Sequence, residues 1–290
     1  MKSKKIIYYY QTFKGLDKLI KMGNNCPVTH IHLSAIHFGT NSDGSLYIHL
    51  NDNDPESSKF TKVWQQCETL TQMGIKIILM IGGAGCAFQK LFSNFSSYYS
   101  LLKNTILKHN CICGVDLDVE EIISIENIET LIHQIKYDFG SEFIISMAPV
   151  SYSMINDNPG MGGFCYKDLL NSNTGRFINY FNVQCYGDFS FAIYDAIIKN
   201  GYDPSMIVMG MISSDFNKTN FNQALTEVAK CLQKYDNFGG VYDWEYYSAP
   251  PNSSDPSQWC LLMKKALYDK YFLNKISFIA SKNKNIFKLI

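Results

Sequence analysis

Residues 114–120 read G-V-D-L-D-V-E, an alternation of apolar and acidic side chains. Alternate residues of a β-strand point to the same side, about 6–7 Å apart. We therefore expect Asp116, Asp118 and Glu120 to project together, with the valines and the leucine on the other side. Three carboxylates on one buried face repel each other and resist desolvation, so folding alone does not favour this pattern. The repulsion should raise the pKa of at least one acid, as general acid catalysis near neutral pH requires.

Two other interpretations of this strand stay open. The first is a solvent-facing acidic edge strand, which the surrounding apolar pattern disfavours. The second is a magnesium or manganese site, but no nearby motif supplies further ligands. The nine cysteines are scattered, and the close pair Cys111 and Cys113 has no second pair to complete a zinc site. We therefore expect no metal and no other cofactor.

Short apolar runs recur along the chain and are mostly separated by helix-like segments. The expected strands cover residues 6–10, 31–38, 75–81, 115–120, 143–148, 180–186, 207–210 and 240–244. The expected helices cover residues 16–22, 59–73, 98–109, 128–139, 191–200, 221–234 and 258–271. Strands that alternate with helices imply parallel pairing through right-handed crossovers. The count and spacing of these runs predict an α/β fold, a single (β/α)8 TIM barrel.

The chain reads as one domain, because no linker rich in glycine, serine or proline interrupts it. We assign residues 1–280 to the barrel and residues 281–290 to a Lys- and Asn-rich tail of unknown order. Long loops are expected at residues 39–55 and 150–164. In a barrel, loops that follow strands form the mouth where functional sites are built.

The composition excludes several classes of protein. The 290 residues include 26 basic and 26 acidic side chains, which argues against a nucleic-acid binder that relies on charge. No apolar run approaches the ~20 residues needed to span a bilayer. The lysines near the start precede only two isoleucines, so no signal peptide is recognisable and a cytoplasmic location is favoured over secretion. We expect a monomer without nucleic-acid or membrane partners.

Extended by one residue, the acidic strand matches a known signature. The sequence C-G-V-D-L-D-V-E at 113–120 resembles the D-G-x-D-x-D-x-E motif of glycoside hydrolase family 18, which contains chitinases and endo-β-N-acetylglucosaminidases. Other stretches follow in the family's order: Y-Y-Y-Q at 8–11, M-I-G-G at 80–83, M-A-P at 147–149, N-V-Q-C-Y at 182–186 and G-G-V-Y-D-W-E at 239–245. The similarity therefore covers nearly the whole chain.

The resemblance implies a retaining glycoside hydrolase that cleaves β-1,4 bonds after N-acetylglucosamine in chitin or chitooligosaccharides. In this family the acetamido oxygen of the substrate attacks the anomeric carbon and forms an oxazolinium intermediate. Glu120 would be the general acid and later the base. Asp118 would orient the acetamido N–H and stabilise its positive charge, and Asp116 would tune Asp118 by sharing a proton. Tyr186 would donate its hydroxyl to the acetamido carbonyl.

The resemblance also implies residues that bind the N-acetylglucosamine-containing oligo- or polysaccharide. Trp244 would form the apolar floor under the sugar ring. The other assigned residues are Gln184, Met147, Tyr9, Gly82 and Gly83. Gln184 shares a face with Tyr186, whereas packing that lines the pocket is the simpler role for Met147. Tyr9 could contact Asp116, although three consecutive tyrosines leave its register open. The two glycines permit close approach of the backbone.

Two positions depart from the family pattern. Cys113 stands where the family has its first aspartate, and Met80 stands where it usually has serine. Both positions normally support the inner carboxylate, so we expect Asp116 to have lost polar partners. Because Glu120 and Asp118 are retained, we expect activity to survive.

Three alternatives to a chitinase stay open. One is an endo-β-N-acetylglucosaminidase acting on N-glycans, since no tandem surface aromatics for gripping crystalline chitin are evident. Another is a non-catalytic protein that binds chitooligosaccharides, favoured by the two departures above. The last is a metal-dependent hydrolase using His30, His32, His37 and Asp243. The first two of these histidines open their strand, away from the expected mouth, so packing or solvent contact is the simpler interpretation.

Overall fold

The computed structural model describes residues 4–269 and 271–272, and it contains all eight strands that the sequence predicts. The strands are β1 (Lys5–Tyr10), β2 (His30–Thr40), β3 (Leu46–Leu50), β4 (Lys76–Gly82), β5 (Ile112–Asp118), β6 (Ile144–Met147), β7 (Tyr180–Gln184), β8 (Ile207–Ile212) and β9 (Gly240–Trp244). The helices are α1 (Asp17–Ile20), α2 (Thr61–Gln72), α3 (Ala87–Ser93), α4 (Phe95–Lys108), α5 (Ile125–Phe139), α6 (Ser151–Ile155), α7 (Tyr166–Asn171), α8 (Phe191–Lys199), α9 (Phe221–Lys234) and α10 (Ser257–Tyr268). The predicted tail at 281–290 lies outside the described residues.

The strands form one sheet in the order β1-β9-β8-β7-β6-β5-β4-β2-β3, and β1 also pairs with β2. This order is that of a closed eight-stranded parallel barrel, so the predicted (β/α)8 fold is confirmed. Strand β3 is an addition to the barrel and pairs with β2 in the antiparallel sense.

Two compact units make up the chain, and each is described by itself. The central unit contains residues 31–181, and the terminal unit contains the described residues of 1–30 and 182–290. The central unit carries most of β2, all of β3 to β6 and the start of β7. The terminal unit carries β1, the rest of β7, β8 and β9.

Helix α5 of the central unit shows how its local sequence sets its boundaries. Its N-cap Ser124 accepts a hydrogen bond from the backbone N–H of Asn127, which satisfies one donor of the first turn. Gly140, with φ of 83°, ends the helix in a conformation that favours glycine. The apolar face predicted from Ile128, Leu131, Ile132 and Ile135 is fully buried. The expected amphipathic helix is therefore present, and it begins three residues earlier than predicted.

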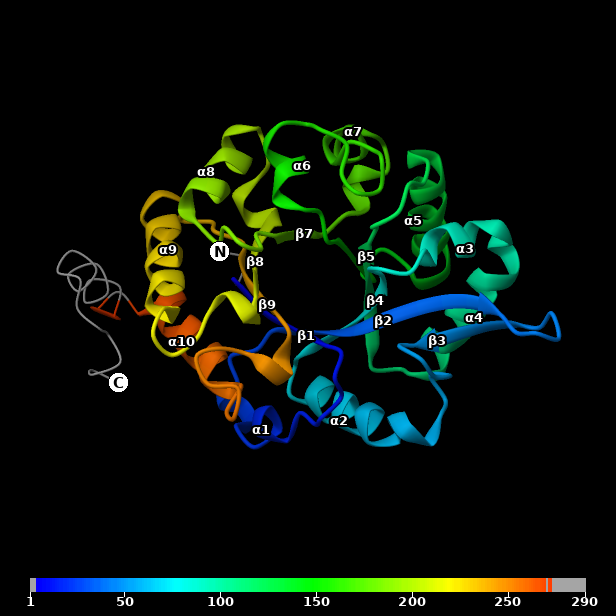
Figure 1. Ribbon diagram of the computed structural model, residues 1–290, viewed down its shortest axis with the longest axis horizontal. Coiled ribbons are helices and arrows are strands. Elements are labelled where there is room, and N and C mark those ends of the chain that lie inside the picture. Colours follow the sequence, from blue (N-terminus) through cyan, green and yellow to red (C-terminus); the bar gives the residue numbers. More distant parts are fainter. Residues whose placement is uncertain (1–3, 270, 273–290) are drawn as a thin grey trace. The chain divides into compact units, whose positions relative to one another are not determined.

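The region predicted as a long loop at 39–55 instead contains β3. Residues 36–40 of β2 pair with 46–50 in an antiparallel hairpin, and Figure 1 shows α4 beside β3. Residues 41–45, N-S-D-G-S, form the turn, in which the Asn41 N–H donates to the carbonyl of Ser45. Asn, Asp and Gly between two apolar runs are typical of a hairpin turn, and this signal was overlooked. The other predicted loop, at 150–164, contains the short helix α6.

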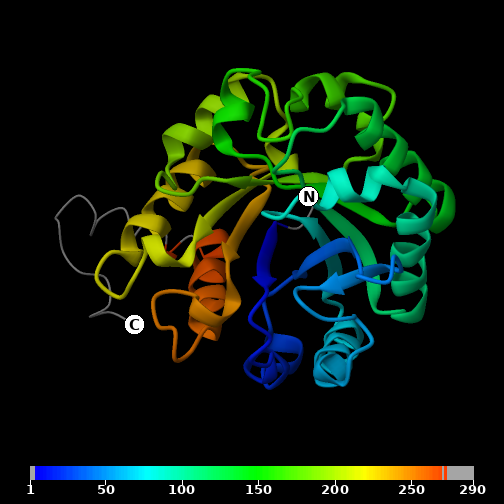
Figure 2. The same ribbon diagram turned by 45° about the vertical axis from the view of Figure 1, so that its right-hand side comes forward.

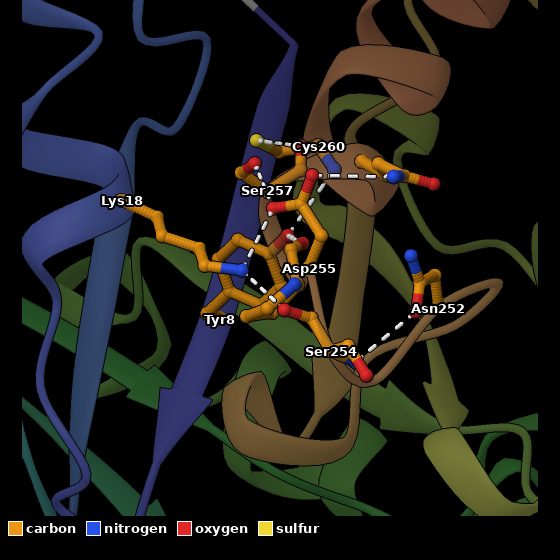
Figure 3. A network of polar contacts seen from close by, with 9 residues as sticks. Tyr8, Lys18, Asn252, Ser254, Asp255, Ser257 and Cys260 are labelled. Atoms are coloured by element: carbon orange, nitrogen blue, oxygen red, sulfur yellow. Dashed lines mark hydrogen bonds and ion pairs between the residues drawn. The ribbon is translucent and has the colours of Figure 1, made fainter.

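In the terminal unit, polar contacts attach helix α10 to the first strand. Figure 2 shows α10 beside β1, and Figure 3 shows the contacts between them. The Tyr8 hydroxyl on β1 donates to the Pro256 carbonyl and accepts from the backbone N–H of Cys260, with an N···O distance of 3.2 Å. Lys18 on α1 forms an ion pair with Asp255 at 3.3 Å. The two hydrogen bonds of Tyr8 satisfy a hydroxyl that would be costly to bury alone.

None of the helices within residues 4–269 and 271–272 has the length and apolar character that crossing a bilayer requires.

Candidate active site

The acidic strand β5 carries two buried aspartates, and the glutamate lies just past its end. Asp116 and Asp118 are 0% and 5% exposed, whereas Glu120 is half-buried. The strand ends at Asp118, two residues earlier than predicted, so Glu120 lies on the loop that follows. In the sheet register, Asp116 pairs with Met80 of β4 and Ser146 of β6. The three carboxylates therefore run from the buried strand to a partly accessible position.

The pKa of Asp118 is raised well above its ordinary value, as the crowding of three acids predicts. Burial is the largest cause, followed by the charges of Glu120, Asp116 and Glu121. Burial and these neighbours therefore favour the protonated form of Asp118, close to three other carboxyl groups.

Asp116 has two polar partners, which corrects the expectation that it had lost its support. The Ser146 hydroxyl donates to Asp116 Oδ1 at 2.6 Å, and His32 Nδ1 lies 3.3 Å from Asp116 Oδ2. His32 Nε2 lies 3.1 Å from the hydroxyl of Tyr180. Neither Ser146 nor Tyr180 was predicted as a partner of Asp116. His32, expected to pack or to face solvent, is fully buried among polar groups.

The two residues that depart from the family pattern lie inside the central unit. Met80 is buried on β4, and the thiol of the half-buried Cys113 donates to the Ile77 carbonyl at an S···O distance of 3.5 Å. Burial raises the pKa of this thiol, so it behaves as a neutral side chain.

Gly82 and Gly83 lie where the backbone of β4 meets the end of β5. A Cβ atom on Gly82, whose φ is 99°, would lie 2.2 Å from the carbonyl oxygen of Asp118. The Gly83 N–H donates to the same carbonyl at 2.8 Å. Glycine is thus required for this close approach, and the two residues fix the backbone of Asp118.

Glu121, which was not among the predicted residues, directly follows Glu120 and contacts the start of helix α3. Its Oε1 accepts hydrogen bonds from the backbone N–H groups of Phe88 and Gln89, in the first turn of the helix. A carboxylate at this end satisfies donors that the helix itself leaves unpaired.

Met147 is fully buried on β6. Its register partners are Leu117 of β5 and Phe181 of β7, so it shares their side of the sheet and not that of Asp116. This placement favours packing over substrate contact for Met147.

In the terminal unit, three of the predicted residues belong to one aromatic cluster. The ring centroid of Tyr9 lies 5.2 Å from that of Trp244 and 5.0 Å from that of Tyr242. The Tyr242 hydroxyl donates to the Tyr186 hydroxyl at 3.2 Å, and the side-chain amide of Asn182 donates to Tyr9 at 2.9 Å. Tyr242 and Asn182 therefore join residues that the sequence analysis named separately.

The members of this aromatic cluster differ in how far they are exposed to solvent. Tyr9 is buried, whereas Tyr186 and Trp244 are half-buried. Gln184, the last residue of β7, is half-buried two positions before Tyr186. The aromatic rings of Tyr186 and Trp244 thus combine apolar faces with partial access to solvent, as a sugar ligand requires.

A second buried carboxylate pair lies at the end of β9. The Ser213 hydroxyl donates to Asp243 Oδ2 at 2.9 Å, and Oδ1 has no hydrogen-bond partner among the described residues. Burial, and then the charge of Glu245, raise the pKa of Asp243 well above its ordinary value. Glu245 accepts hydrogen bonds from the Gln11 N–H at 3.1 Å and from the Thr12 side chain.

The histidines proposed as metal ligands have other partners. His30 Nδ1 lies 2.7 Å from the Thr29 hydroxyl, and His32 lies between Asp116 and Tyr180. Within the part of the chain that the structure describes, no three His, Cys, Asp or Glu side chains come together as a metal site would require.

Comparison with known proteins gives no match to a family model and no match among curated proteins. Solved structures do match. A fungal endo-β-N-acetylglucosaminidase of glycosyl hydrolase family 18 is 27% identical with a TM-score of 0.78, covering 92% of this chain and 99% of that one. A chitinase from Aspergillus fumigatus is 29% identical with a TM-score of 0.76, covering 92% and 100%. A family 18 chitinase from Pseudoalteromonas aurantia, 21% identical with a TM-score of 0.68, covers 91% and 100% and supports the fold alone.

Proposed function

We propose that this chain, which is similar over 92% of its length to solved glycosidases of family 18, is itself a retaining glycoside hydrolase. The glycosidase class is supported by the chitinase and the endo-β-N-acetylglucosaminidase among its structural neighbours. Its substrate would be the β-1,4 bond after N-acetylglucosamine in chitin or chitooligosaccharides. The observation that carries the proposal is the β5 column of two buried aspartates followed by the half-buried Glu120.

The proposed reaction uses the acetamido group of the substrate as the nucleophile. Its oxygen attacks the anomeric carbon while Glu120 protonates the departing glycosidic oxygen, and an oxazolinium forms. Glu120 then removes a proton from water, which opens the oxazolinium with retained configuration. The partial exposure of Glu120 suits a group that must exchange protons with substrate and water.

Asp118 would hold the acetamido N–H and stabilise the positive charge that develops there. Its raised pKa favours the protonated form at rest. If Asp118 shares that proton with Asp116, an anionic oxygen becomes available when the oxazolinium forms. This role explains why two acids are buried side by side on one strand.

Two residues of the terminal unit complete the proposal. Tyr186 accepts a hydrogen bond from Tyr242, and in the proposed reaction its own O–H donates to the acetamido carbonyl. Trp244 would form an apolar floor for the sugar, with Tyr9 packed against its indole ring. Gln184 would bond the sugar or a neighbouring carboxylate.

The test compares the wild type with Glu120→Gln on a soluble chitooligosaccharide. We expect the wild type to release smaller oligomers and the variant to lose about 10²- to 10⁴-fold in kcat, because a general acid contributes that much. Circular dichroism should show the same fold for both proteins. Equal product release by the two proteins would refute the enzyme, and binding without cleavage by both would support a carbohydrate-binding protein instead.

The fungal neighbour supports a second substrate, the chitobiose core of N-glycans. Parallel assays on a chitooligosaccharide and a high-mannose glycoprotein separate the two. Faster cleavage of the oligomer supports the chitinase, whereas faster release of the glycan supports the endo-β-N-acetylglucosaminidase.

A further inference from the structure

Four buried polar side chains, one of which is the inner carboxylate, form a ring, and each comes from a different strand. Its members are Asp116 on β5, Ser146 on β6, Tyr180 on β7 and His32 on β2. None is more than 2% exposed. Ser146 and His32 contact the two oxygens of Asp116, His32 contacts Tyr180, and a hydrogen bond between Tyr180 and Ser146 closes the ring. All four lie in the central unit.

The protons of this ring can be assigned by chemistry. Burial, together with the charge of Asp116, raises the pKa of Tyr180 well above its ordinary value, so its hydroxyl keeps its proton. Because the single proton of Ser146 is donated to Asp116, the Tyr180 hydroxyl donates to Ser146 Oγ and accepts from His32 Nε2–H. When Asp116 is ionised, His32 Nδ1 donates to Asp116 Oδ2, because an ionised carboxylate only accepts. Asp116 is therefore contacted by one donor on each oxygen.

We propose that His32 and Ser146 are positioning residues that keep Asp116 ionised in the resting protein and thereby leave the shared proton on Asp118 until the oxazolinium forms. They act in place of the aspartate and serine that Cys113 and Met80 replace in this chain. The inference rests on the proposed glycosidase function and identifies what sustains its inner carboxylate. Hydrogen bonds to a charged form favour that form, and no apolar residue at 32 or 146 could supply them.

The titratable groups near Asp116 are consistent with this role. On β5 and the loop after it these are Cys113, Asp118, Glu120 and Glu121, whereas β4 presents the uncharged Met80 in register. The β2, β6 and β7 strands present His32, Ser146 and Tyr180. The other acids repel a charge on Asp116, so the donors of the ring are what favours its ionised form.

The first experiment measures the pH profile of kcat/KM for His32→Phe, His32→Asn and the wild type on a fluorogenic chitooligosaccharide. Phenylalanine removes the Nδ1 donor, so Asp116 takes up a proton more easily. The acid limb should then move to higher pH by about one to two units. Asparagine places an amide N–H near the position of Nδ1 and should leave the limb close to that of the wild type.

His133→Asn is the matched control. Like His32, His133 contacts a hydroxyl through Nε2, that of Thr174 at 3.0 Å, but it lies on α5 and has no role in the proposed reaction. Its profile should equal that of the wild type. If His32→Phe and His32→Asn lower kcat/KM equally at every pH without moving the acid limb, His32 is only structural and the inference is wrong.

A second measurement tests the inference without an activity assay. Carbon-13 NMR of aspartate labelled at the carboxyl carbon follows the titration of Asp116, which is assigned by comparison with Asp116→Asn. Asp116 should titrate at higher pH in His32→Phe and in Ser146→Ala than in the wild type. An unchanged titration in both variants overturns the inference. If the wild type cleaves no substrate, the proposed function fails while this titration still tests the ring.

Discussion

Two strands of the barrel end in an acidic alternation, and only one of them has the properties of a catalytic strand. Strand β5 of the central unit runs into D-L-D-V-E at 116–120, and β9 of the terminal unit runs into D-W-E at 243–245. In both, burial is the main cause that raises the pKa of an aspartate. A buried, protonated carboxyl group is therefore not by itself evidence of chemistry.

The difference lies in what the following glutamate does. Glu245 is 7% exposed, and its two oxygens accept hydrogen bonds from residues 11 and 12, so it attaches a loop. Glu120 is half-buried. The pKa of Asp118 is raised first by burial and then by three carboxyl groups, those of Glu120, Asp116 and Glu121. Glu245 is thus saturated with donors from one loop, whereas Glu120, the carboxylate that we propose for proton transfer, stays partly accessible.

The largest expected difference between the two strands is in catalysis. Asp118→Asn should lower kcat about 10³-fold, since an amide cannot supply the negative charge that stabilises the oxazolinium. Asp243→Asn should leave kcat within a few-fold of the wild type. Steady-state kinetics on a chitooligosaccharide measures both. A comparable loss in both variants would remove the distinction between the two strands.

The second prediction concerns the backbone under the catalytic strand. Gly82→Ala should lower the free energy of unfolding by about 3 kcal/mol, since the new Cβ would meet the Asp118 carbonyl and φ is positive. Gly74→Ala is the control, because its φ is 85° but no atom lies within 4 Å of the new Cβ, and it should cost about 1 kcal/mol. Equal costs in urea denaturation would show that the contact with Asp118 is unimportant.

Glu245→Gln should affect stability and not chemistry. The amide replaces one acceptor oxygen with a donor that faces N–H or O–H groups of residues 11 and 12, at a cost of about 2 kcal/mol. Thermal unfolding gives the stability, and kcat should stay near that of the wild type. A loss of kcat as large as that of Glu120→Gln would make β9 a second catalytic strand.

The smallest expected effect is a change in pH dependence. The folded pKa of Asp243 lies well above its ordinary value of 3.8, so the folded state binds this proton more tightly than the unfolded state. Its contribution to stability is therefore present below pH 3.8 and is lost as the pH rises through the folded pKa. Because asparagine does not titrate, Asp243→Asn removes this pH-dependent loss of stability.

The gain in unfolding free energy of Asp243→Asn over the wild type should grow as the pH rises above 3.8 toward the folded pKa, by at most about 1.4 kcal/mol per pH unit. Urea denaturation at a series of pH values measures it. Parallel pH slopes for the two proteins would mean that Asp243 is ionised in the fold.

The sequence predicted the barrel because its strands and helices have local signatures. The apolar runs, the helical periodicity of residues 128–139 and the alternation at 114–120 all report on which side of an element a residue lies. The antiparallel strand at 46–50 was overlooked, although its N-S-D-G-S turn was readable.

The partners of the inner carboxylate, in contrast, could not be predicted from the sequence. Asp116, Ser146, Tyr180 and His32 lie far apart in the chain, and their hydrogen bonds depend on the register of four strands. The departures from the family motif at Cys113 and Met80 predicted that Asp116 had lost polar partners, and the structure corrected this prediction.

By itself, the sequence determined the order of the elements and the residues able to donate or accept protons, because periodicity and side-chain chemistry are local properties. Only the tertiary structure decided which carboxylates are saturated, which keep their protons and which histidine contacts Asp116. Burial and hydrogen bonding depend on neighbours that the fold supplies from distant parts of the chain.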